Sequence, residues 1–224
     1  MTGPADTTDA PRPGDLPSPE SDSMLETVKK AAVELKRAEI AFALCGGWAA
    51  YARGGPRSGH DADFAMQEHD VPRALDVLEK AGFSVGDPPE DWLAKVYDGE
   101  HLVDLIYRLS GRPVTSDMVS GCEQLEVGSV AMPVLSATDL VIAKLLSFQH
   151  HHCDFAWALP MVRALREQVD WPHVRRETSQ SPFAEAFLLL ADRLGLTGCQ
   201  SVPGRVGPAA DQAVGAEGGG ADEY

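Results

Sequence analysis

Asp61 and Asp63, two positions apart, are the residues whose type and spacing most directly suggest chemistry. They open an apolar stretch that predicts a strand, and alternate side chains of a strand point to the same face. Two carboxylates aimed at one point repel each other unless a cation lies between them, and carboxylate oxygens favour Mg²⁺. The pair predicts a metal site, although an isolated Asp-x-Asp is also common where a loop simply enters a strand.

Gly46 and Gly47 follow an apolar strand predicted over 40–45 and precede a short helix predicted over 48–53. Glycines let the backbone approach a phosphate closely, and the N–H groups that open a helix favour an anion. The two glycines could also merely close a tight turn. Beside a pair of metal-binding carboxylates, however, a phosphate site indicates phosphoryl or nucleotidyl transfer.

Asp104 is a third candidate because it stands alone in the apolar run Leu102–Ile106. Burying an unpaired carboxylate costs several kcal/mol, so this side chain is expected to face a cation. The run reads as the return strand of a hairpin that turns at Asp98-Gly99. We therefore expect Asp104 on a strand beside Asp61 and Asp63, where it also becomes the candidate general base.

The stretch from Cys45 to Met66 resembles the signature of the nucleotidyltransferase fold of the DNA polymerase beta superfamily, in its small stand-alone branch. Its Gly-Gly-Trp-Ala followed by Asp-x-Asp is similar to the aminoglycoside and lincosamide nucleotidyltransferases. It is equally similar to the nucleotidyltransferase-like toxins of toxin–antitoxin systems. In the commonest signature a Ser follows the first Gly and another often precedes the Asp pair; here those slots hold Gly47 and His60.

This resemblance implies an α/β fold, with a small mixed β-sheet core, flanking helices and a C-terminal helical region. It implies transfer of a nucleoside monophosphate from an NTP to an acceptor hydroxyl, with pyrophosphate released and two Mg²⁺ ions as cofactors. The residues expected to act are, as catalytic and metal-binding groups, Asp61, Asp63 and Asp104, and, as nucleotide-binding groups, Gly46, Gly47, Arg57 and Lys144.

Several of these positions have a second interpretation. Arg57 could contact phosphate or pair with a surface acid. Lys144 matches the Lys of the family's Asp-Leu-x-x-x-Lys-Leu segment, which begins here at Asp139, but it could instead extend from an amphipathic helix to solvent. Asp154 matches an Asp of the next helix and could equally be an ordinary helix N-terminal acid. His60 could contact phosphate or form a local cap.

Two other functions remain open from the sequence. One is a toxin that nucleotidylates a tRNA or a protein, for which an antitoxin would be the partner. The other is a catalytically silent nucleotide-binding domain, which the intact set of three carboxylates disfavours. The roles of His150, His151 and His152 stay undefined, because adjacent residues do not easily converge on one metal ion.

The net charge of −15 bears on the acceptor. The two tails, 1–23 and 197–224, contribute −4 and −3, which leaves −8 on the remainder of the chain. A strongly acidic surface repels phosphate backbones, so we expect a small-molecule acceptor rather than nucleic acid. Scattered cysteines, no signal-like apolar run and no apolar stretch of about 20 residues predict a cytoplasmic protein without a membrane segment.

The chain divides by composition into four segments. Residues 1–21 are rich in Pro and predict a disordered leader, and 197–224 predict a disordered acidic tail. Residues 22–135 are expected to form the nucleotidyltransferase core, and 136–196 the helical region, with helices over 155–167, 171–178 and 182–194. All four tryptophans, Trp48, Trp92, Trp157 and Trp171, are expected in the core.

Overall fold

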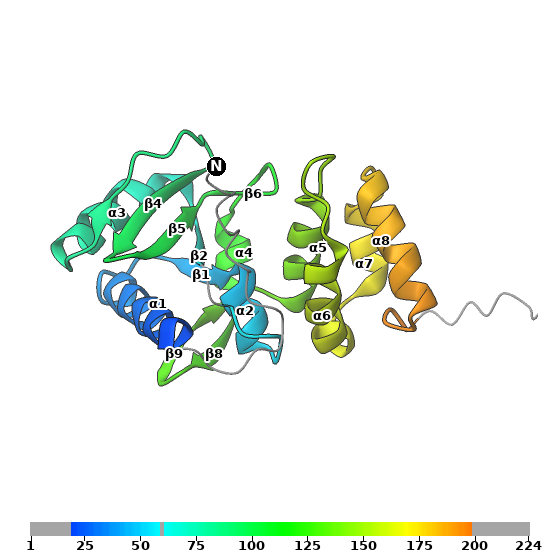
Figure 1. Cartoon of the computed structure of the whole chain (residues 1–224). Coiled ribbons are helices and arrows are strands. Elements are labelled where there is room, and N and C mark those ends of the chain that lie inside the picture. The colour runs from blue at the N-terminus through cyan, green and yellow to red at the C-terminus, as the bar shows by residue number, and fades with distance from the viewer. Residues whose placement is uncertain (1–18, 59–60, 199–224) are drawn as a thin grey trace, which may run out of the picture.

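The computed structural model describes residues 19–58 and 61–198, and it shows a mixed sheet joined to a group of C-terminal helices (Figure 1). The main sheet has seven strands in the order β3-β4-β5-β2-β1-β9-β8. The strands are β1 (Phe42–Cys45), β2 (Asp61–Met66), β3 (Ser84–Val85), β4 (Leu93–Asp98), β5 (His101–Ile106), β8 (Glu123–Val127) and β9 (Val130–Val134). This α/β architecture with a mixed sheet is the fold class that the sequence predicts.

The centre of the sheet combines both strand directions. β2 pairs antiparallel with β1 and parallel with β5, and β1 pairs parallel with β9. β4 and β5 form the hairpin predicted at Asp98-Gly99, where Gly99 has a φ of +63°. The parallel pairing of β2 with β5 places Asp63 directly opposite Asp104. The two strands that carry the predicted carboxylates are therefore neighbours.

The helices of the core are α1 (Pro19–Arg37), α2 (Gly46–Ala52), α3 (Val71–Lys80), preceded by the 3-10 turn η1 (Glu68–Asp70), and α4 (Ser116–Ser120). α1 begins a few residues before Ser23, where its apolar period first becomes visible; the rest of the predicted leader lies outside the described residues. α1 and α3 pack on each other and on the sheet. The core includes Phe42 and Phe64, whose rings meet edge to face.

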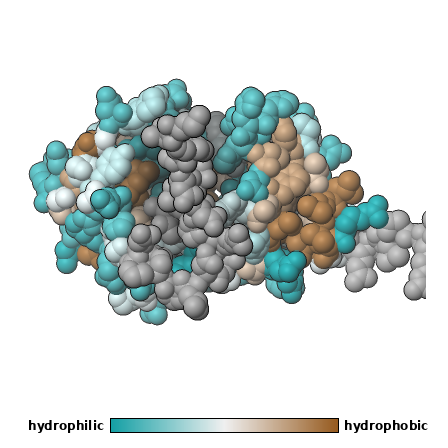
Figure 2. Space-filling model, viewed as in Figure 1, coloured by the Kyte–Doolittle hydropathy of each residue, from teal (hydrophilic) through white to brown (hydrophobic). Residues whose placement is uncertain are grey.

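The C-terminal helices follow the predicted order. They are α5 (Ala137–Leu146), α6 (Phe155–Leu165), the 3-10 turn η2 (Arg166–Gln168), α7 (Trp171–Glu177) and α8 (Pro182–Arg193). Ser136 caps α5, as its sequence indicates, because its Oγ accepts a hydrogen bond from the Asp139 N–H. Figure 2 shows hydrophobic surface on these helices, where Leu189 and Leu194 are among the exposed large side chains.

α5 joins the two parts of the molecule. Leu140 belongs to the core built on the sheet, whereas Val141 and Leu145 belong to a second core shared with α6, α7 and α8. Polar contacts add to this connection: Arg112 pairs with Glu177 at 2.6 Å, between the small hairpin β6 (Arg108–Leu109) and β7 (Arg112–Pro113) and α7. The helical region is thus packed directly on the core built around the sheet.

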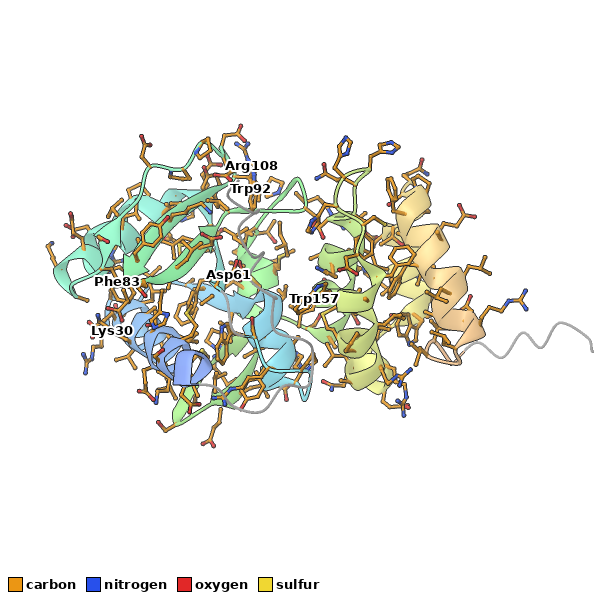
Figure 3. The ribbon with its side chains drawn as sticks, in the orientation of Figure 1. Lys30, Asp61, Phe83, Trp92, Arg108 and Trp157 are labelled. Atoms are coloured by element: carbon orange, nitrogen blue, oxygen red, sulfur yellow. The ribbon has the colours of Figure 1, made fainter. Side chains whose placement is uncertain are left out.

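Two of the four tryptophans contradict their predicted burial. Trp48 is fully buried and Trp171 is 8% exposed, but Trp92 is 41% and Trp157 is 38% exposed. Trp92 immediately precedes β4, and Trp157 lies on α6 (Figure 3). The expectation fails because the size of an aromatic side chain says nothing about which side of a loop or helix the fold covers.

Candidate active site

Three carboxylates meet where β2 and β5 lie side by side. Asp61, Asp63 and Asp104 each offer one oxygen, and these oxygens all lie within 4.8 Å of one another. The cross-strand register produces this geometry, because Asp63 and Asp104 are opposite each other and Asp61 is on the same face two residues earlier. The structure thus brings together the three side chains expected to bind metal. Figure 3 places Asp61 near the middle of the molecule.

Burial, and then the proximity of the other acids, raises the pKa values of Asp63 and Asp104. The pKa of Asp63 is raised from 3.8 to about 8, chiefly by desolvation and then by the negative charges of Asp61 and Asp104. The pKa of Asp104 is also raised, again mainly by burial. Positive charge from Lys95 opposes both shifts. Carboxylates that repel one another when they are ionised are stabilised by a bound cation.

Lys95 is a site residue that the sequence does not single out. It lies on β4 directly opposite Asp104, and its Nζ donates to Asp104 Oδ1 at 3.3 Å. Its side chain is only 19% exposed. The alternating pattern of β4 predicts a polar face at Lys95, but the sequence does not show that this face looks onto carboxylates.

Glu90 adds a fourth carboxylate to the neighbourhood. It lies in the loop before β4, and its charge raises the pKa of Asp104. One of its oxygens, Oε2, is buried without a hydrogen-bond partner among the described residues. Glu90 is not one of the three acids whose oxygens lie within 4.8 Å of one another. No sequence signal distinguishes it, because a Glu in a Pro-rich loop is ordinary.

Gly46 and Gly47, the glycine turn, are the first two residues of α2 rather than a separate segment before a helix over 48–53, and they lie directly against this cluster. Gly46 has a φ of +60°, and a Cβ atom built on it would lie 1.8 Å from Asp63 Oδ2. A Cβ on Gly47 would lie 2.5 Å from Ser58 Oγ. A side chain at either position would displace Asp63 or Ser58, Gly46 also has the left-handed backbone that favours glycine, and the first residues of α2 reach the carboxylates.

The structure places Lys144 toward the cluster and Arg57 on a surface acid. Lys144 lies on α5, and its charge lowers the pKa of Asp63. Its Nζ also lies 6.0 Å from the centre of the Phe148 ring. Arg57 donates to Asp22 on α1 at 2.7 Å and lies over the Tyr51 ring, which is the second of its two interpretations.

The remaining predicted residues have local structural roles or lie outside the description. Asp154 caps α6 by accepting a hydrogen bond from the Ala156 N–H at 2.8 Å. His152 forms an isolated bridge with Gln149, and His150 contacts the Phe183 ring edge to face. His60 lies outside the described residues. These positions give no sign that the three consecutive histidines converge on one point.

The carboxylates do not line either of two cavities on the protein surface. One cavity, of about 610 Å³, is lined by α6 and η2. The other, of about 390 Å³, lies between α2, α4 and the start of α5, where it includes Arg53 and Asp139. The chemistry expected of this protein therefore rests on the side-chain cluster itself and on the glycine turn beside it.

A family described as "Uncharacterised nucleotidyltransferase" matches residues 20–196, and the chain belongs to this family. No curated protein matches the chain. None of the described helices has the length and apolar character needed to span a membrane.

Solved structures of similar fold have low sequence identity to this chain. ANT(2'')-Ia in complex with adenylyl-2''-tobramycin is 16% identical with a TM-score of 0.47, over 79% of this chain and 98% of that one. The lincosamide antibiotic adenylyltransferase LnuA, lincomycin-bound, is 11% identical with a TM-score of 0.43, over 64% and 94%. An antigenic nucleotidyltransferase-like protein from Paracoccidioides brasiliensis is 17% identical with a TM-score of 0.44, over 81% and 94%.

Proposed function

We propose that this protein transfers a nucleoside monophosphate from an NTP to a hydroxyl group of a small acceptor molecule and releases pyrophosphate. The observation that carries the proposal is the convergence of Asp61, Asp63 and Asp104 within 4.8 Å, beside a glycine turn that contacts Asp63 directly. Membership of a nucleotidyltransferase family supports the same reaction class. The acidic net charge of −15 favours a small acceptor over a nucleic acid.

The three carboxylates fit Mg²⁺, because they supply hard oxygen ligands at one point and lose mutual repulsion when a cation is present. Asp61, Asp63 and Asp104 would hold two such ions. Bound there, Mg²⁺ would neutralise the charge that develops on the attacking and leaving oxygens of an in-line displacement.

The residues of the chain have separable roles in this reaction. The side-chain-free backbone at Gly46 and Gly47 can approach the triphosphate closely, and the cations of Arg57 and Lys144 attract it. Asp104 accepts the proton of the acceptor hydroxyl as the new bond from that oxygen to the α-phosphorus forms. The bond between the α-phosphorus and the bridging oxygen breaks, and pyrophosphate leaves with the electron pair.

The proposal is tested by incubating the protein with each labelled NTP, Mg²⁺ and a cell extract, and by searching for products heavier by one NMP. We expect adducts on a small molecule, formed by the wild type and lost in the Asp61→Ala, Asp63→Ala double variant. The double variant Asp76→Ala, Glu126→Ala removes two exposed acids remote from the site and should retain activity. Adducts found only on RNA or protein would show that the acceptor is a macromolecule and not a small molecule. The absence of adducts from every fraction would refute the transfer reaction.

NTP binding gives a second, independent measurement. Calorimetric titration of the wild type should show tighter NTP binding with Mg²⁺ than without it, because the metal offsets repulsion between the carboxylates and the triphosphate. The Asp61→Ala, Asp63→Ala variant should lose this difference while it keeps its fold by circular dichroism. Equal affinity of the wild type in the two conditions would contradict the metal-binding role of the cluster.

A further inference from the structure

The side chain of Ser58 packs against Gly47 in the candidate active site. An ideal Cβ built on Gly47 would lie 2.5 Å from Ser58 Oγ and 2.8 Å from Ser58 Cβ. The Ser58 side chain therefore fills the space that a side chain at position 47 would need. Gly46, the preceding residue, makes the equivalent close approach to the Asp63 carboxylate. The Ser58 hydroxyl and a carboxylate of the cluster thus lie against neighbouring glycines of one turn.

Two hydrogen-bond donors of the segment that carries Ser58 have no side-chain acceptor among the described residues. Within residues 19–58 and 61–198, the Ser58 hydroxyl makes no side-chain hydrogen bond. Arg57, immediately before it, directs one terminal nitrogen to Asp22, but its Nε is buried and has no partner among these residues. The Ser58 side chain is only partly buried, so its hydroxyl is available to a ligand with acceptor oxygens, whereas the buried Arg57 Nε shows that the segment is incompletely hydrogen-bonded.

The chemistry of the surroundings selects the kind of ligand. The Ser58 hydroxyl, beside two residues without side chains, suits phosphate oxygens, which accept several hydrogen bonds and tolerate close backbone approach. Asp63, on the other glycine of the turn, would hold the cation that accompanies a triphosphate. A hydrogen-bond donor for the triphosphate, Ser58, and a carboxylate for its metal ion, Asp63, thus lie beside two consecutive residues of the backbone.

The geometry points to Ser58 as a nucleotide-binding residue whose Oγ donates a hydrogen bond to a phosphate oxygen of the bound NTP. This inference rests on the proposed nucleotidyl transfer and adds a residue to its binding site. It also explains why position 47 is a glycine, since a side chain there would displace the Ser58 hydroxyl. The hydroxyl comes from the loop after α2 rather than from the turn itself.

Calorimetric binding of Mg-ATP, Mg-GTP, Mg-CTP and Mg-UTP to the full chain tests the role of Ser58. For whichever nucleotide the wild type binds, Ser58→Ala should weaken binding about tenfold, the scale of one hydrogen bond to a charged group. Ser58→Thr should stay within about threefold of wild type, because it keeps the hydroxyl. Ser116→Ala, on α4, is the matched control and should bind like the wild type.

A relocated hydroxyl gives the decisive comparison. The double variant Gly47→Ser, Ser58→Gly places a hydroxyl in the same space from the opposite side, and it should recover most of the binding lost in Ser58→Ala. Wild-type affinity in Ser58→Ala, with normal melting, would overturn the role of Ser58 and leave the proposed function intact. Failure of the wild type to bind any of the four Mg-NTPs would overturn both.

Discussion

Lys95 and Asp104 face each other across β4 and β5, with Lys95 Nζ 3.3 Å from Asp104 Oδ1. This ion pair gives the carboxylate cluster a resident positive charge that does not depend on metal. The same lysine lowers the pKa of Asp63, so its influence extends beyond its direct partner. The stability of the metal-free protein should therefore depend on Lys95, and that of the metal-bound protein much less.

Replacing Lys95 should destabilise the metal-free protein in a pH-dependent manner. Lys95→Met leaves the acids without their cation, so we expect a loss of about 1 to 3 kcal/mol at pH 8. The loss should be smaller at pH 5, where protonation already relieves the repulsion. Urea melts in EDTA measure both values. Equal losses at the two pH values would mean that Lys95 contributes packing rather than charge.

Asp104→Asn should raise the melting temperature of the metal-free protein at neutral pH, because burial disfavours the ionised carboxyl despite Lys95. The same variant should lower nucleotidyl transfer by at least about 10²-fold, the scale of a lost general base. A double-mutant cycle with Lys95→Met separates the coupling energy between Lys95 and Asp104 from the cost of burying the Asp104 carboxylate. A destabilised Asn variant that keeps its activity would make Asp104 a structural residue.

The raised pKa of Asp63 predicts how stability changes with pH. Its folded pKa of about 8 lies above the 3.8 of an unperturbed carboxyl, so the folded state binds a proton that the unfolded state releases. This contribution is complete below pH 3.8 and is lost as pH rises through about 8. Without metal, the free energy of unfolding should therefore fall between these values, by at most about 1.4 kcal/mol per pH unit.

Urea melts from pH 5 to 8 in EDTA test this dependence. Asp63→Asn should give a flatter profile than the wild type, whereas Asp76→Asn, at an exposed helical position, should keep the wild-type slope. Binding of Mg²⁺ at pH 7 should also release protons, seen as a buffer-dependent heat in calorimetry. A wild-type slope in Asp63→Asn would place the titrating group elsewhere.

Gly46→Ala should disable metal binding without unfolding the protein. The new methyl group would meet Asp63 Oδ2 at 1.8 Å and push this flexible carboxylate out of place. Gly99→Ala is a matched control, because its φ of +63° imposes the same strain and its surroundings are open. Gly99→Ala should lose about 1 kcal/mol of stability, and Gly46→Ala at least as much, because its methyl group also displaces Asp63. Only Gly46→Ala should lose Mn²⁺ binding, and retained binding would show that the turn does not constrain Asp63.

The pair between Arg57 and Asp22 provides a test of nucleotide binding by Arg57. Asp22 is 64% exposed at its side chain, so Asp22→Asn should change stability by less than about 1 kcal/mol. Because Arg57 is released from this partner, the Asp22→Asn variant should bind Mg-NTP several-fold more tightly than the wild type. The Arg57→Ala variant should bind Mg-NTP more weakly. Unchanged binding in Arg57→Ala would limit this residue to holding α1 against the loop.

The sequence predicts the three acids because each stands out locally. Asp61 and Asp63 share a strand face by alternation, and Asp104 interrupts an otherwise apolar run. Lys95 and Glu90 escape prediction because their importance comes from cross-strand register and from a loop conformation. Neither property is written in the neighbouring residues. A Lys on the polar face of a strand looks solvent-exposed until the adjacent strand is known.

The helices and hairpins are predicted wherever a clear period or a turn signal exists. The hairpin at Gly99 and the cap at Ser136 are examples of signals confined to a few residues. The short hairpin of β6 and β7 and the five-residue helix α4 are missed. Segments of this length are too short to show a recognisable hydrophobic period. The exposure of Trp92 and Trp157 is decided by which surfaces the distant segments cover.

The register between β2 and β5 also makes the site a check on folding. Because side chains alternate along a strand, a slip of one residue would turn Asp104 to the opposite face of the sheet. A chain misfolded in this way would have no complete set of acids and would gain nothing from a cation. Mg²⁺ added during refolding would therefore stabilise only molecules with the correct strand register. By mass action, it would raise the fraction of correctly paired sheets.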